Sequence, residues 1–269
     1  MEQPRHDLPT LAELGPDLTR ISPMQKCVTI ALPFLAVAAY GLFAALGCWP
    51  LAIGCIGVFA FVSYGSTSHD LVHNNLGLSR RLNQALLSVI ELLGLRSGHA
   101  YRLAHLHHHR AFPNDDDVEA AAARASLLGA LLDGTTRQFR IWLWALQRSG
   151  PDRLAILAEG LGCVAIAGAA IISWAITPAP LVWVILVVLG SWTFPLLTVY
   201  LPHDAAGPDE LHRSLRFRGK VTDFIFRSHF YHLEHHLYPK VPHHHWRELA
   251  ERLDPFLDRA GIKPVIWGI

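Results

Sequence analysis

The apolar residues of this chain gather into four long runs separated by polar segments. A helix needs about 20 mainly apolar residues to cross a bilayer, and four runs reach or approach that length: residues 27–46, 51–67, 154–176 and 181–201. Only four residues separate the first run from the second, and only four separate the third from the fourth. The pattern therefore predicts two hairpins of membrane-spanning helices.

Two shorter amphipathic segments lie between the predicted hairpins. Leu82–Leu95 is apolar enough for a helix but is interrupted by polar residues such as Glu91, and it is too short to span a bilayer. We expect it to form an interfacial or re-entrant helix. Arg137–Gln147 has the same character, and Trp142 and Trp144 suit the headgroup region.

Composition and charge support a membrane protein and suggest its orientation. Apolar residues make up 51% of the chain and charged residues 17%, with a net charge of +1 that argues against nucleic acid as a partner. All 23 lysines and arginines lie outside the four runs and their tight turns. The positive-inside rule then places both termini and the central loop in the cytoplasm of a multi-pass cell-membrane protein.

These patterns define the expected architecture. Residues 1–26 are polar, with several prolines, and we expect a short, partly disordered cytoplasmic lead. Residues 27–269 should form a single membrane-bound domain. We expect an all-α integral membrane protein with four transmembrane helices in two hairpins and a cytoplasmic helical cap.

The histidines carry the chemical signal. Three boxes stand beside the predicted spans, with spacings i, i+4 or i, i+3, i+4 that place their members on one helical face. An outlier, His203, ends the fourth run. These nine candidate metal ligands are His69, His73, His105, His108, His109, His203, His232, His235 and His236.

Such a set predicts a site for two metal ions. The eight box histidines supply four ligands for each metal, and His203 would be the ninth ligand. Imidazole alone does not select among iron, zinc, copper and nickel. The lack of thiolate ligands and the two-metal arrangement favour two non-haem iron ions.

Carboxylates near the boxes are candidates for orienting the ligands. A ligating imidazole usually donates its second ring N–H to an acceptor. The candidates for this role are Asp70 beside the first box, Asp116 with its neighbours Asp115 and Asp117 in the acidic run after the second, Asp204 after His203, and Glu234 within the third.

The three boxes, written HDLVH, HLHHH and HLEHH here, resemble those of the membrane-bound fatty-acid-desaturase superfamily. The resemblance covers about residues 30–255. It implies a diiron enzyme that uses O2 to attack an unactivated C–H bond of a lipid. Because the chain has no ferredoxin-like cysteine set or haem-binding segment, it also implies an external electron donor such as ferredoxin.

Within that superfamily the carotenoid ring ketolases and hydroxylases are the most similar branch. The similarity rests on three stretches: residues 69–73 followed by Leu82-Asn83 and residues 101–105, the Leu201-Pro202-His203 run, and residues 231–242 around the third box. The chain departs from ketolases at His243 and His244, where they usually have two tryptophans.

Two alternatives stay open. The Leu-Glu pair inside the third box is equally at home in acyl-lipid desaturases and hydroxylases, so a fatty acyl chain is the second candidate substrate. A metal transport protein is a remote alternative. Transporters place their ligands inside the spans, whereas these histidines lie outside them.

Overall fold

The computed structural model describes residues 8–219 and 230–266. Residues 1–7 of the expected lead, and 220–229 and 267–269 of the tail, lie outside the described residues. Up to Tyr200 the described elements are helical. In chain order they are α1 (Leu11–Leu14), η1 (Pro16–Thr19), α2 (Pro23–Ala45), α3 (Trp49–Val62), η2 (Ser63–Thr67), α4 (Ser68–His73), α5 (Arg80–Leu93), α6 (Gly98–Ala111), η3 (Glu119–Arg124), α7 (Leu127–Arg148), α8 (Arg153–Ser173), α9 (Ala179–Ser191) and η4 (Pro195–Tyr200). The carboxy-terminal part holds β1 (Phe217–Arg218), α11 (His232–Leu237), η5 (His243–His245), α12 (Trp246–Arg259) and β2 (Val265–Ile266).

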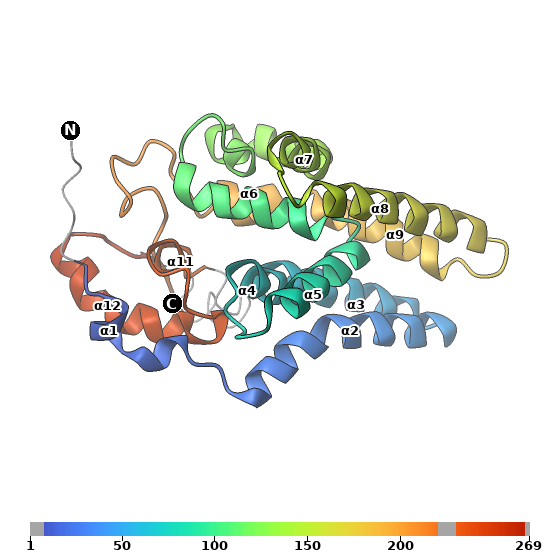
Figure 1. The fold of residues 1–269 in the computed structure, drawn as a ribbon, viewed down its shortest axis with the longest axis horizontal. Coiled ribbons are helices and arrows are strands. Elements are labelled where there is room, and N and C mark those ends of the chain that lie inside the picture. Colours follow the sequence, from blue (N-terminus) through green and yellow to red (C-terminus); the bar gives the residue numbers. More distant parts are fainter. Residues whose placement is uncertain (1–7, 220–229, 267–269) are drawn as a thin grey trace.

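The two predicted hairpins are present. Among the described residues, four stretches are long and apolar enough to cross a membrane, namely Pro16–Ala45, Trp49–His73, Arg153–Ser173 and Ala179–Tyr200. Figure 1 shows the α2–α3 and α8–α9 hairpins projecting to the same side, with α1, α11 and α12 at the opposite end. The protein is an all-α integral membrane protein, as its hydrophobic pattern predicts.

The hairpins pack against each other through aromatic residues. The ring of Trp183 in α9 contacts Tyr40 of α2 and Phe59 of α3, with centroids 4.9 and 5.0 Å apart. Both contacts are edge-on, the arrangement that aromatic quadrupoles favour.

The helix α5 enters between the hairpins (Figure 1). Its last residue, Leu93, packs with Leu95 against the aromatic cluster of the spans, and the Leu93 carbonyl accepts a hydrogen bond from Trp183 Nε1 at 3.0 Å. This placement favours the re-entrant alternative over the interfacial one. Because the chain then returns through α6, the re-entrant turn leads directly into the second histidine box.

The amino-terminal segment is more ordered than its composition suggests. Leu14 and Leu18 are buried in a cluster with Leu249 and Leu253 of α12. These contacts give residues 8–22 a defined place against α12. A side-chain cap from Ser22 to Gln25 N–H starts α2 at Pro23, four residues before the expected start.

Candidate metal centre

The first box lies at the end of the second span. The helix passes through a π-helical segment, η2, and continues as α4, which carries His69 and His73. Asn74 ends α4 because it adopts a left-handed conformation with φ of 59°. Both imidazoles are buried, at 7% and 5% exposure.

The other ligand candidates come from three elements. His105, His108 and His109 lie on α6, and His232, His235 and His236 on α11. His203 follows η4, a second π-helical segment, in the fourth span. Single π-helical segments often mark functional sites, and here one precedes a candidate ligand in each of two spans.

The structure brings all nine predicted ligands together in two groups. Within each group one ring nitrogen per residue lies within 4.8 Å of the others. The first group holds His69, His73, His105, His109 and His235; the second holds His108, His203, His232 and His236.

The boxes of α6 and α11 are each divided between the two groups. His105 and His109, one helical turn apart, belong to the first group, and His108 belongs to the second. On α11 the division is reversed, because His232 and His236 join the second group and His235 the first. The one helical face that the spacing predicts for each of these boxes therefore serves two groups, and His203 brings the second group to four.

Hydrogen bonds fix which nitrogen of several rings faces inward. His108 Nδ1 lies 2.7 Å from Asp117 Oδ2, and His203 Nδ1 donates to the Val199 carbonyl at 2.9 Å. Acceptors at Nδ1 assign the proton to that nitrogen and leave Nε2 with its lone pair. The Nε2 atoms of His108 and His203 then face each other at 3.0 Å. Two such lone pairs repel unless a cation lies between them.

A proton is a poor candidate for that cation. Burial, followed by the neighbouring His232 and His108, holds the pKa of His203 well below its usual range. Burial and histidine neighbours act in the same direction on the pKa of His235 and His236. In the first group, His73 Nε2 is buried without a hydrogen-bond partner among residues 8–219 and 230–266. Neutral, converging imidazole nitrogens fit metal ions such as iron.

Within residues 8–219 and 230–266, two carboxylates contact Nδ1 of ligand candidates: Asp117, from the expected acidic run, and Glu119, which was not expected. Asp117 contacts His108, and Glu119 Oε2 lies 3.2 Å from His105 Nδ1. Asp116 of the same run is exposed and lies 3.1 Å from His107. The sequence therefore predicts the run that holds Asp117, whereas no short motif links Glu119 to the box.

The other three expected carboxylates have different partners. Asp70 Oδ2 lies 2.6 Å from His243 Nδ1, which ties η5 to the first box. Asp204 accepts a hydrogen bond from the Ala206 N–H at 2.9 Å. Glu234 is fully buried and accepts from Arg218 Nη2 at 2.6 Å. These contacts position the segments that carry the histidines.

A fully buried arginine supports Glu119. Arg137 of α7 has 0% exposure, and its guanidinium donates to the Glu119 carbonyl at 2.6 Å and to Glu119 Oε1 at 3.2 Å. Although burial opposes ionisation, His105 and Arg137 hold the pKa of Glu119 well below its usual range. The carboxylate therefore stays charged and can hold the His105 ring in one orientation.

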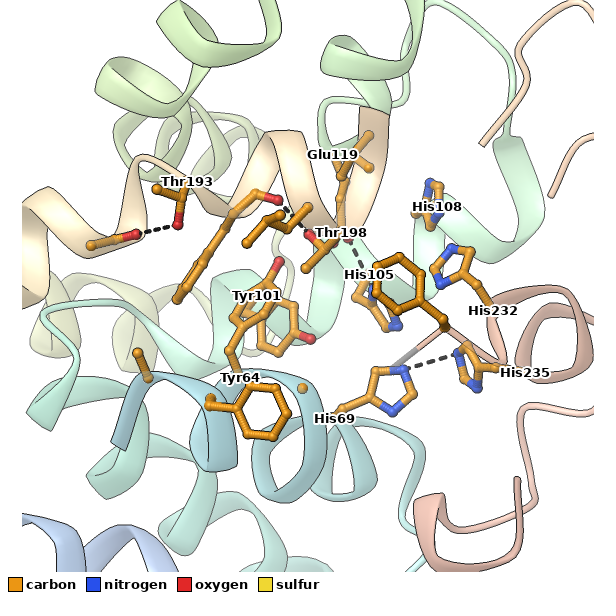
Figure 2. Close-up of a pocket in the computed structure, with 18 of the residues that line it drawn as sticks. Tyr64, His69, Tyr101, His105, His108, Glu119, Thr193, Thr198, His232 and His235 are labelled. Atoms are coloured by element: carbon orange, nitrogen blue, oxygen red, sulfur yellow. Dashed lines mark hydrogen bonds and ion pairs between the residues drawn. The ribbon is translucent and has the colours of Figure 1, made fainter. Parts of the chain in front are cut away.

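A cavity of about 410 Å³ leads away from the histidines. Figure 2 shows His69, His105, His108, His232 and His235 gathered on one side of it, with Thr193 on the other. Apart from the histidines, its lining is mainly apolar and aromatic, including Phe61, Tyr64 and Phe194. Its volume lies in the ordinary range for ligand pockets.

The fold and the site together define a class. The chain is a multi-pass membrane protein in which nine histidines gather in two groups at the ends of spans and on adjoining helices, and five of them line an apolar cavity. The sequence profile of the family described as fatty acid desaturase matches residues 43–265, and the chain belongs to this family. It is therefore a membrane oxidoreductase of the desaturase and hydroxylase type. A comparison with curated protein sequences gave no match.

Proposed function

We propose that the chain is an O2-dependent, non-haem diiron oxidase that attacks unactivated C–H bonds of a membrane lipid. The first candidate reaction is ketolation or hydroxylation of a carotenoid ring. The observation that carries the proposal is the pair of interleaved histidine groups at one end of an apolar cavity. The proposed site faces the cytoplasm, where an external donor such as ferredoxin supplies electrons.

The nine histidines named above would hold the two irons. Bound there, the irons would supply the activation of O2 and the oxidation of the substrate carbon. The protein's own residues provide the surroundings. Asp117 and Glu119 hold the proton on Nδ1 of His108 and His105, so that each Nε2 stays available. The aromatic wall excludes water and orients an apolar chain toward the histidines.

Substituting His108→Ala tests the metal assignment. We expect loss of bound iron and of lipid oxidation, with membrane insertion unchanged. The matched control is His107→Ala, because His107 is the neighbouring residue in the same helix and contacts Asp116 and Trp144 rather than the histidine groups. Retained activity in His108→Ala would refute the diiron proposal.

The family match also supports a second candidate, desaturation or hydroxylation of a fatty acyl chain. Expression in a β-carotene-producing bacterium, followed by chromatography of pigments and fatty acids, separates the two. We expect oxygenated pigment. Unchanged pigment with altered fatty acids would assign the acyl substrate instead.

The geometry gives less support to metal transport. Glu159, the acidic residue of the third span, accepts hydrogen bonds from Ser88 and Ser97, both at 2.5 Å, and from the His99 N–H at 3.1 Å. These contacts hold α8 against α5 and the start of α6. A transport pathway instead needs polar groups that line a route through the spans.

A further inference from the structure

The cavity has an apolar side formed by two membrane-spanning helices. Gly57 and Phe61 of α3 line it on one helix, and Gly190, Thr193 and Leu197 line it on the α9–η4 span. These residues lie three or four positions apart in each span, so each set shares one helical face. The two faces form the walls farthest along the spans from the histidine boxes.

Three of these lining residues are exposed. Gly57 and Thr193 are exposed, and Leu197 has 40% of its surface accessible. Residues that line a closed, packed cavity are usually shielded by their neighbours, as Tyr64 and Phe194 are here at 7% and 8%. The exposure is therefore concentrated where α3 and α9–η4 border the cavity.

The two glycines border open space. A Cβ placed on Gly57 or Gly190 has no atom within 4 Å in the described part of the chain. A glycine that permits close helix packing behaves differently: a Cβ on Gly134 would lie 2.1 Å from the Trp192 carbonyl oxygen. Gly57 and Gly190 thus leave a gap between two spans that are in contact elsewhere, at Phe59 and Trp183.

From these observations we infer that the cavity opens sideways into the bilayer between α3 and α9–η4, and that its substrate is a lipid dissolved in the membrane. The identity of the substrate as an oxidised lipid rests on the proposed function, whereas the opening between the spans rests on the structure alone. An apolar opening within the spans admits a hydrocarbon without passing it through water. It also allows part of a long substrate to stay in the bilayer, so the whole molecule need not fit within about 410 Å³.

Spin labelling tests the opening without relying on activity. The label is attached at Leu197→Cys in the full-length chain with its four native cysteines replaced by serine, in phosphatidylcholine–phosphatidylglycerol vesicles. We expect strong relaxation by lipid-dissolved O2, weak relaxation by a water-soluble nickel chelate, and immobilisation of the label when β-carotene is added to the bilayer. Relaxation mainly by the nickel chelate would overturn the inference, because it would show an opening to water.

A tryptophan at Gly57 tests the route by activity. Gly57→Trp should slow oxidation of the bilayer-dissolved lipid by at least about tenfold, which corresponds to about 1.4 kcal/mol for an overfilled site. Gly54→Trp is the matched control, because Gly54 is an exposed glycine of the same helix with open space at its Cβ and lies outside the cavity lining. Bound iron should be equal in both variants. Equal rates would overturn the route.

The spin-label and activity experiments together distinguish failure of the proposed function from failure of the opening. If the unsubstituted protein oxidises no lipid while the label still reports an opening to the bilayer, the proposed function fails and the opening stands. If lipid is oxidised but the label reports water, the proposed function stands and the opening fails.

Discussion

Single side chains around the histidines determine whether the centre keeps its shape. Arg137 and Glu119 form an ion pair with side-chain exposures of 0% and 5%, and Glu119 also contacts His105. A buried pair of this kind contributes little net stability over an apolar pair, but removing one member leaves the other charge uncompensated. The pair therefore makes the position of one proposed ligand depend on a residue in a different helix.

Replacing Arg137 with methionine should be strongly destabilising. We expect a loss of about 3–5 kcal/mol, because the Glu119 carboxylate stays buried without its cation. Chemical unfolding in detergent measures the change. Arg140→Met is the control, since Arg140 lies on the same helix and pairs with Asp133 while 35% exposed; its loss should cost less than about 1 kcal/mol. Similar losses of stability in both variants would contradict the inference that burial makes the Arg137–Glu119 pair costly to break.

At the scale of elements, the length of the apolar runs predicts the membrane spans. It does not predict how the helices arrange the histidines. Run lengths predicted both hairpins, because a bilayer imposes a minimum length on an apolar helix; the larger boundary differences are at Pro16 and His73, where the helical stretches extend beyond the apolar runs. Helical spacing likewise predicted that the histidines of a box share a face. Spacing could not show that α6 and α11 each serve two groups, because that division depends on how the helices cross. Nor could it find Glu119, whose position depends on the turn between α6 and η3.

Helix α7 and the α9–η4 span pack so closely at Gly134 that there is no room for a Cβ. Gly134→Ala would place a Cβ 2.1 Å from the Trp192 carbonyl oxygen, so the helices must separate. We expect a loss of about 1–3 kcal/mol in stability and weaker iron binding, because His203 follows η4. The measurements are unfolding in detergent and iron content.

The control for this packing is Gly168→Ala in α8, where the added Cβ meets no atom within 4 Å in the described chain. Helix propensity then makes the substitution neutral or stabilising by up to about 1 kcal/mol. A stable, iron-replete Gly134→Ala protein would show that the two helices are less tightly packed than the structure indicates.

At the scale of the whole molecule, folding brings together rings that resist protonation. Burial, followed by neighbouring histidines, holds the pKa of His109, His203, His235 and His236 well below the ordinary value of 6.5. The unfolded chain takes up protons on these residues as pH falls through about 6.5, whereas the folded chain does not. Their contribution to stability is therefore complete above that pH and is lost progressively below it.

The iron-free protein should accordingly unfold at a lower temperature at about pH 5.5 than at about pH 7.5. Thermal unfolding of chelator-treated protein at each pH provides the measurement. A transition temperature that does not change, or rises, on acidification would contradict the linkage.

The division of the α6 and α11 boxes between both histidine groups has a consequence for how the centre is assembled. A metal ion bound by one group would fix the orientation of both helices and so arrange most of the partner group before its own ion arrives. We expect the second ion to bind more tightly than the first, so that iron titrations are sigmoidal and half-loaded molecules are scarce. The same coupling means that losing one ion loosens the other.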